Sequence, residues 1–236
     1  MLSSWLNKKD LNRYFTEFIG TFILVFVGTG AIVIDVVTTG TVGNLGIGLT
    51  FGLIVMAVIV ATGHISGAHI NPAVTLAFAV TRHFPKRDIL PYWIAQLAGA
   101  CAASAIVLGL FGDVRQLGAT LPRDTASQAF IIEFFLTTIL MFVIMAVATD
   151  TRIVKSNAAI AIGAVVALEA TYAGPITGAS MNPARSFGPS LVSGYFTDQW
   201  LYWLGPILGA VFGGLLYRFI HRMDAEGEHA NGSNGS

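Results

Sequence analysis

The sequence predicts an all-α membrane protein with six transmembrane helices and two half-length helices, arranged as an inverted repeat. Three observations support this fold class. Hydrophobic residues make up 54% of the chain and charged residues only 11%, six apolar stretches are long, and two shorter ones follow similar sequences. A soluble domain typically carries about 25% charged residues. The polar residues here are too few to cover a soluble protein with so many buried helices.

Six apolar stretches are long enough to cross a bilayer. A helix needs about 20 mainly apolar residues to span the ~30 Å hydrocarbon core. The stretch from Val36 to Thr81 contains no charged residue and is too long for one crossing, so it must hold more than one element. The hydropathy pattern predicts crossings near 12–36, 45–64, 89–111, 126–148, 157–174 and 200–221.

Two further apolar segments, near 71–81 and 182–193, are too short to cross. Each has about ten residues, or ~15 Å of helix, and therefore reaches about halfway through the hydrocarbon. Ile65-Ser-Gly-Ala-His-Ile-Asn-Pro-Ala leads into the first segment, and Ile176-Thr-Gly-Ala-Ser-Met-Asn-Pro-Ala leads into the second. Because each half has three crossings, an odd number, the second copy must lie inverted relative to the first.

These repeats divide the chain into five parts. We assign an N-terminal segment to 1–10, the first repeat to 11–112, an outer linker loop to 113–124 and the second repeat to 125–222. The last part, 223–236, is polar and rich in Gly and Ser, so we expect a disordered tail.

The Lys and Arg positions predict the orientation, because cytoplasmic loops collect these residues. A cytoplasmic N-terminus leaves only Arg115 and Arg123 in the outer linker, with Arg185 inside the second repeat. The remaining cations then lie on the cytoplasmic side: Lys8, Lys9, Arg13, Arg82, Lys86, Arg87, Arg152, Lys155, Arg218 and Arg222. We therefore expect a multi-pass protein of the cell membrane with both termini in the cytoplasm.

An Asn-Pro-Ala tripeptide opens each of the two short segments: Asn71-Pro72-Ala73 and Asn182-Pro183-Ala184. Asn can cap a helix and Pro suits its first position, so one copy alone would indicate only a helix start. Two copies at matching places of inverted repeats are far more specific. Together with the words around them, Ser66 to Thr75 and Gly178 to Ser186, they resemble the aquaporin family, also called major intrinsic proteins. The resemblance extends from about Leu11 to Arg222.

This resemblance implies a homotetramer in the lipid bilayer, in which each subunit is a passive channel for water and small neutral solutes that excludes protons and ions. The half-helix N-termini, each carrying about +0.5 elementary charge, would meet near mid-membrane. The side-chain amides of Asn71 and Asn182 would donate hydrogen bonds to a passing oxygen. Backbone carbonyls before each half-helix would line the channel: Gly67, Ala68, His69 and Ile70, and Gly178, Ala179, Ser180 and Met181.

Arg185 follows the second tripeptide directly. An intramembrane Arg costs at least ~2.5 kcal/mol, so it normally faces a wet cavity or a partner, such as the carbonyls of a loop. The resemblance places Arg185 in the narrowest constriction, with Phe51, Ala170 and Ala179. Because the water-selective pattern has His at the place of Ala170, we expect a wider, partly apolar constriction. A channel mainly for glycerol, urea, ammonia or undissociated metalloid acids is the alternative.

Three acidic residues lie within the predicted crossings. Glu17 and Glu133 occupy matching places in the repeats, so we expect them to accept hydrogen bonds from the loop N–H groups rather than to relay protons. Glu169 adjoins Ala170 and either tunes the outer mouth or braces a neighbouring helix. For His64 and His69, a fixed hydrogen bond to the loop backbone is favoured over a response to pH.

Other function classes fit less well. A secondary transporter can also have broken helices and inverted repeats, but it usually needs ionisable groups for coupling, and only Arg185 is expected to face the pore. A structural or adhesive membrane protein would need larger outer loops. The net charge of +0 gives no case for nucleic acid. No phosphate loop, metal-ligand spacing or nucleophile–base pair is present, so we expect no enzyme activity, cofactor or metal.

Overall fold

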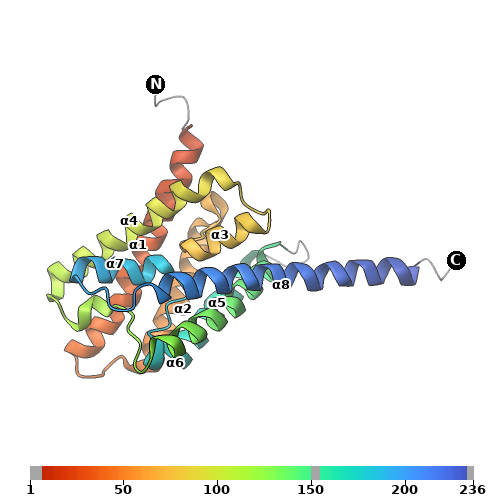
Figure 1. Ribbon diagram of the computed structural model, residues 1–236. Coiled ribbons are helices and arrows are strands. Elements are labelled where there is room, and N and C mark those ends of the chain that lie inside the picture. The colour runs from red at the N-terminus through yellow and green to blue at the C-terminus, as the bar shows by residue number, and fades with distance from the viewer. Residues whose placement is uncertain (1–6, 150–154, 233–236) are drawn as a thin grey trace.

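The computed structural model describes residues 7–149 and 155–232, and this part of the chain is helical (Figure 1). Within these described ranges, six helices are long and apolar enough to cross a membrane: α1 (Lys8–Val37), α2 (Gly43–Ser66), α4 (Ile89–Phe111), α5 (Ala126–Thr149), α6 (Lys155–Thr177) and α8 (Leu201–Gly232). The half-length helices are α3 (Pro72–Val80) and α7 (Pro183–Ser193), and two 3-10 turns are η1 (Lys86–Asp88) and η2 (Arg115–Gly118). The predicted all-α membrane fold is confirmed.

The helices pack in the same way in both halves. In the first half α1 packs against α2 and α4, and in the second half α5 packs against α6 and α8. The halves meet where α2 packs against α6. Each half-helix also contacts the last crossing of the other half, α3 on α8 and α7 on α4, so the two repeats interlock.

Glycines allow the packed helices to approach closely at matching places of the repeats. A Cβ atom on Gly99 would lie 2.3 Å from the carbonyl oxygen of Phe18, and one on Gly209 would lie 2.3 Å from that of Phe134. No real Cβ tolerates such a distance from backbone. The α1–α4 and α5–α8 pairs therefore depend on small residues at their crossing points.

We expect Gly209→Ala to lower the free energy of unfolding of the purified protein in detergent by about 1–3 kcal/mol, the usual cost of overpacking. The melting temperature should fall accordingly. The matched control is Gly109→Ala on α4, where an added Cβ meets nothing within 4 Å. This control should stabilise slightly, since Ala is favoured over Gly inside a helix by about 1 kcal/mol. Equal melting shifts for the two variants would contradict the packing argument.

The first and last helices begin and end at other residues than the sequence predicts. A disordered tail is predicted over 223–236, whereas α8 continues to Gly232. Extending a helix that has already formed adds one hydrogen bond for each residue fixed, so it can continue into sequence that contains Ala and Glu. At the other end α1 begins at Lys8, capped by Asn7. The expectations for 1–6, for the loop that holds Arg152 and for 233–236 lie outside the described residues.

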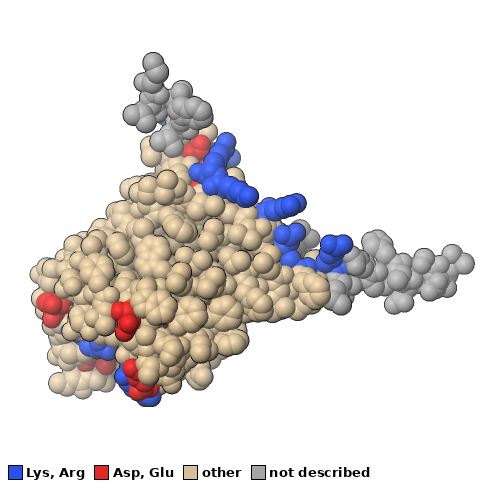
Figure 2. Space-filling model, viewed as in Figure 1, with Lys and Arg blue, Asp and Glu red and all other residues tan. Residues whose placement is uncertain are grey.

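On the face drawn in Figure 2, charged side chains gather toward the two ends of the molecule and leave most of the surface between them uncharged. Figure 2 shows most of the visible Lys and Arg side chains at the end from which the N-terminal segment projects. Several Asp and Glu side chains lie near the opposite end. The apolar band between them suits a bilayer.

Candidate functional site

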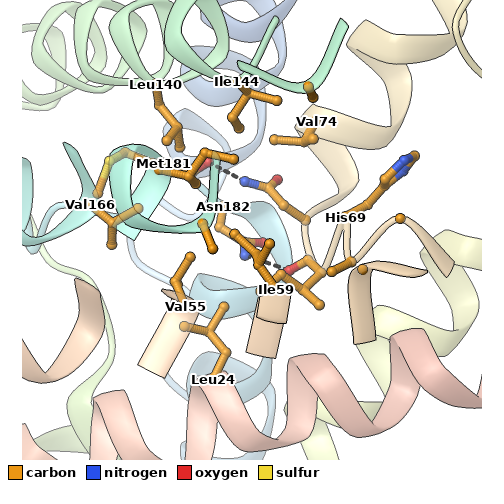
Figure 3. Close-up of a pocket in the computed structure, with 18 of the residues that line it drawn as sticks. Leu24, Val55, Ile59, His69, Val74, Leu140, Ile144, Val166, Met181 and Asn182 are labelled. Carbon is orange, nitrogen blue, oxygen red and sulfur yellow. Dashed lines mark hydrogen bonds between the residues drawn. The ribbon is translucent and has the colours of Figure 1, made fainter. Parts of the chain in front are cut away.

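A cavity of about 530 Å³ lies between the two halves, at the place where α3 and α7 begin (Figure 3). Apolar side chains from α2, α5 and α6, such as Val55, Leu140 and Val166, form much of its wall. The polar part of the wall comes from the loops before the half-helices and from the first residues of those helices: Gly67, Ala68, His69, Ile70, Asn71, Ser180, Asn182 and Arg185.

The two loops adopt matching backbone conformations. The φ angles are +90° at Gly67, +49° at Ala68 and +45° at Ile70. At the corresponding residues of the second loop they are +84° at Gly178, +41° at Ala179 and +52° at Met181. Positive φ at a residue other than Gly costs about 1–3 kcal/mol and persists only where the surroundings hold it. Both repeats must therefore supply contacts that hold their loop.

Glu17 supplies those contacts in the first half. Its side chain is 0% exposed. One carboxylate oxygen accepts hydrogen bonds from the Ser66 hydroxyl at 2.7 Å and the His69 N–H at 2.9 Å. The other accepts from the Ile70 N–H at 2.6 Å and the Gln96 amide at 2.8 Å. The carboxylate thereby satisfies loop donors that would otherwise be unpaired at membrane depth.

Glu133 does the same in the second half and is also 0% exposed. It accepts hydrogen bonds from the Thr177 hydroxyl at 2.7 Å, the Ser180 N–H at 2.9 Å and the Met181 N–H at 2.8 Å. This geometry supports the expected structural role of both acids. It does not support a proton relay, because both oxygens of each carboxylate are already hydrogen-bonded to the loops.

The two asparagines cross-link the halves. The side-chain oxygen of Asn71 accepts from the Ala73 N–H, and that of Asn182 accepts from the Ala184 N–H, so each caps its own half-helix. The amide nitrogen of Asn71 donates to the Met181 carbonyl at 2.8 Å. The amide nitrogen of Asn182 donates to the Ile70 carbonyl, also at 2.8 Å, and Figure 3 marks both bonds. An amide has two N–H donors, so each asparagine keeps one for the cavity.

Only one of the three guanidinium nitrogens of Arg185 has a hydrogen-bond partner among the described residues. Its side chain is 2% exposed, and its Nη1 donates to the Gly118 carbonyl at 2.8 Å. The guanidinium carbon lies 5.1 Å from the centre of the Phe51 ring, within the range of a cation–π contact. Nε and Nη2 are buried and have no hydrogen-bond partner among the described residues.

The four residues expected at the constriction are not placed alike. Phe51, Ala179 and Arg185 line the cavity. Ala170 is not among the residues that line it and is buried in the apolar core cluster that also contains Phe51 and Ala179. Of the eight residues expected to line the channel with their carbonyls, Gly178 alone lies outside the cavity wall, and a Cβ there would meet Thr120.

The His69 ring points away from the cavity centre in Figure 3. Its Nδ1 lies 3.1 Å from the Thr75 hydroxyl, and the ring packs against Phe78, Phe84 and Tyr92. The expected hydrogen bond from this ring to the loop backbone is replaced by one to a side chain of α3. His64 lies at the cavity wall, one turn before the loop.

Sequence reasoning missed one pair of supporting residues. The Tyr92 hydroxyl donates to the Ser66 carbonyl, and the Tyr202 hydroxyl donates to the Thr177 carbonyl, both at 2.7 Å. Each Tyr thus fixes the last residue of the long helix that precedes the loop. The available signal was a Tyr-Trp dipeptide at matching places of the repeats, Tyr92-Trp93 and Tyr202-Trp203.

Glu169 differs from the other two acids. It is 6% exposed, and neither of its carboxylate oxygens has a hydrogen-bond partner among the described residues. Neither role expected for it, at the outer mouth or as a brace between helices, is supported by a bond. Within residues 7–149 and 155–232, no group of three or more His, Cys, Asp or Glu side chains is placed to hold a metal ion.

Comparison with known proteins identifies the fold and its relatives. The family profile "Major intrinsic protein" matches residues 3–217. Aquaporin NIP1-3 of Oryza sativa subsp. japonica is 46% identical, with 90% of this chain and 74% of the relative covered. Aquaporin NIP2-1 of Zea mays is 44% identical, with 91% and 73% covered. The X-ray structure of the aquaglyceroporin from Plasmodium falciparum superposes with a TM-score of 0.81 at 29% identity, covering 88% of this chain and 95% of that one. The chain therefore belongs to the major intrinsic protein family, the aquaporins, and is a channel for water and small neutral solutes.

Proposed function

We propose that the cavity beside Asn71 and Asn182 is the pore of this channel. The observation that supports it is the pair of crossed amide bonds, which fixes both side chains and leaves one N–H donor of each for the cavity. A water or hydroxyl oxygen passing this point would accept from both donors. An uncharged solute can replace its hydrogen bonds to water with these bonds. Fast passive flow requires such a replacement.

The same geometry would reject protons and cations. The N-termini of α3 and α7 meet at the asparagines, and each brings about +0.5 elementary charge of helix dipole. A water held by two donors presents its own hydrogens away from them and is poorly oriented to pass a proton along the file. Arg185 adds a full positive charge farther along the cavity wall.

We propose that Phe51, Ala170, Ala179 and Arg185 form the constriction and that the small side chain of Ala170 leaves it wide. Three of these four residues lack a polar side chain, and Arg185 keeps unpaired donors on one side. A wide, half-apolar opening with donors on one wall suits solutes such as glycerol, urea or a neutral metalloid acid as well as water. The structural neighbour, an aquaglyceroporin, is consistent with this assignment.

Permeability measurements on proteoliposomes test this width. The wild type should pass water, glycerol, urea and boric acid, while Ala170→His should keep water flow and reduce glycerol entry by about tenfold, an added barrier of about 1.4 kcal/mol. Ala170→Leu separates size from polarity, because it fills similar space without a hydrogen-bonding ring. Water flow without glycerol entry in the wild type would refute the wide opening, and saturating, gradient-dependent flow would indicate a transporter.

We further propose that the end bearing most Lys and Arg faces the cytoplasm, so that both termini are cytoplasmic in the cell membrane, and that the channel is a homotetramer. Support for the orientation comes from the clustering of cations in Figure 2. Large lipid-facing side chains such as Leu168 and Tyr172 on α6, 70% and 76% exposed, provide surface for neighbouring subunits or lipid. Labelling of introduced cysteines from either side, and the mass of the purified complex, would test both statements.

A further inference from the structure

A second hollow lies on the outside of the helix bundle, between the first turns of α1 and the start of α4. It has a volume of about 510 Å³, and it is lined almost wholly by apolar atoms. Its wall is formed by Leu11, Tyr14, Phe15 and Phe18 from α1 and by Pro91, Ile94 and Ala95 from α4. Leu11 and Phe15 are each 60% exposed, and Ile94 is 59% exposed. We call this hollow the α1–α4 groove.

Both walls of the groove end in a cation. On α1, Lys8 is three residues before Leu11 and seven before Phe15, a spacing that puts it on the same helix face. On the other wall, Arg87 lies four residues before Pro91, in the η1 turn that runs into α4, and its side chain is 80% exposed. Because Arg13 contacts Asp88, Lys8 and Arg87 both lie toward the end of the groove at which α1 and α4 begin.

The two neighbouring acids offset only part of the positive charge at this end, although one of them also pairs with Arg87, whose Nε lies 3.7 Å from the Asp88 carboxylate. Asp88 pairs with Arg13, whose Nη1 lies 2.9 Å from its carboxylate, and it also accepts a hydrogen bond from Tyr14 at 3.1 Å. Asp10 lies 3.6 Å from the same Arg13 nitrogen. The first turn of α1 and the η1 turn together hold Lys8, Lys9, Lys86 and Arg87, against which only Asp10 and Asp88 stand.

We propose that the α1–α4 groove is a binding site for an anionic phospholipid. One acyl chain lies along the apolar wall, and the phosphate is held between Lys8 and Arg87. The apolar lining suits a hydrocarbon chain, and both cations lie at the start of a crossing helix, where lipid headgroups are expected. Cations near a membrane surface favour anionic lipid additively, by about fivefold for each Lys or Arg.

The test uses the full-length protein in detergent, titrated with phosphatidylglycerol and with phosphatidylcholine of the same acyl chains and followed by native mass spectrometry. The wild type should bind phosphatidylglycerol preferentially. Lys8→Gln combined with Arg87→Gln should reduce its affinity about 25-fold, from two cations at about fivefold each. Phosphatidylcholine binding should be unchanged. The matched control is Arg82→Gln with Arg218→Gln, which removes two exposed cations away from the groove.

A groove-filling variant, Ile94→Trp, keeps the cations and should weaken binding of both lipids. Three results would overturn the proposal: equal losses in the two double variants, an undiminished preference for phosphatidylglycerol without Lys8 and Arg87, or a loss of oligomer mass in Ile94→Trp with lipid binding unchanged. The last result would show that a second copy of the chain covers the groove. Water permeability is measured separately, so failure here leaves the pore assignment standing.

Discussion

Replacing Glu133 with Leu should abolish the folded channel. The carboxylate accepts three hydrogen bonds from the second loop, two of them from backbone N–H groups at membrane depth. Hydrogen bonds to a charged group contribute about 1.5–3 kcal/mol each, so their combined loss is comparable to the whole stability of a domain, about 5–15 kcal/mol. We expect no monodisperse protein on size-exclusion chromatography in detergent.

Glu169→Leu is the matched control, since Glu169 is also buried on a crossing helix but neither of its oxygens has a bonding partner among the described residues. Removing a buried carboxyl that makes no hydrogen bond should leave stability unchanged or raise it. A folded and thermally stable Glu133→Leu protein would refute the role given to the three bonds. A collapse of Glu169→Leu would show that this acid has its own partner in the membrane.

Arg185→Val should make the channel leak protons while water flow continues. Among the described residues that line the cavity, Arg185 is the only Lys or Arg, so the substitution removes this positive charge and its donors. A unit charge 4 Å from a passing cation contributes about 4 kcal/mol at an effective dielectric constant of 20, and each 1.4 kcal/mol is tenfold in rate. We expect at least a tenfold rise in proton leak in liposomes loaded with a pH-sensitive dye, together with faster glycerol entry.

Arg185→Lys separates charge from shape. It keeps the positive charge but loses the planar fork that reaches both Gly118 and the cavity. The leak of this variant should stay near the wild-type value, with the solute preference altered. If Arg185→Val were as proton-tight as the wild type, exclusion would depend on the asparagines and helix ends alone.

Much of the fold could be predicted because membrane crossing is a local property of sequence. The stretch predicted near 89–111 is α4, Ile89–Phe111, to the residue. The predicted helix ends differ from the observed ones where the helices leave the hydrocarbon, because its thickness no longer determines helix length there. α1 starts at Lys8 rather than near 12 because Asn7 caps it in the polar zone, and α8 passes its predicted end into polar sequence.

The candidate site could likewise be predicted only in part. The meeting of Asn71 and Asn182 follows from symmetry between the repeats, and so does the bonding of Glu133. The bond from Arg185 to Gly118 could not be foreseen, because any residue offers a carbonyl and the linker has no twin in the other half.

The crossed asparagine bonds also constrain how this protein is made. While the ribosome is still translating α6, the Ile70 carbonyl has no donor and the Asn71 amide has no acceptor in the unfinished half. Each such group costs several kcal/mol if it is left unpaired away from water, so we expect the first half-helix to reach its final position only after Asn182 has been translated. Chains truncated before that point would be substrates for membrane quality-control proteases, and only complete polypeptides would mature.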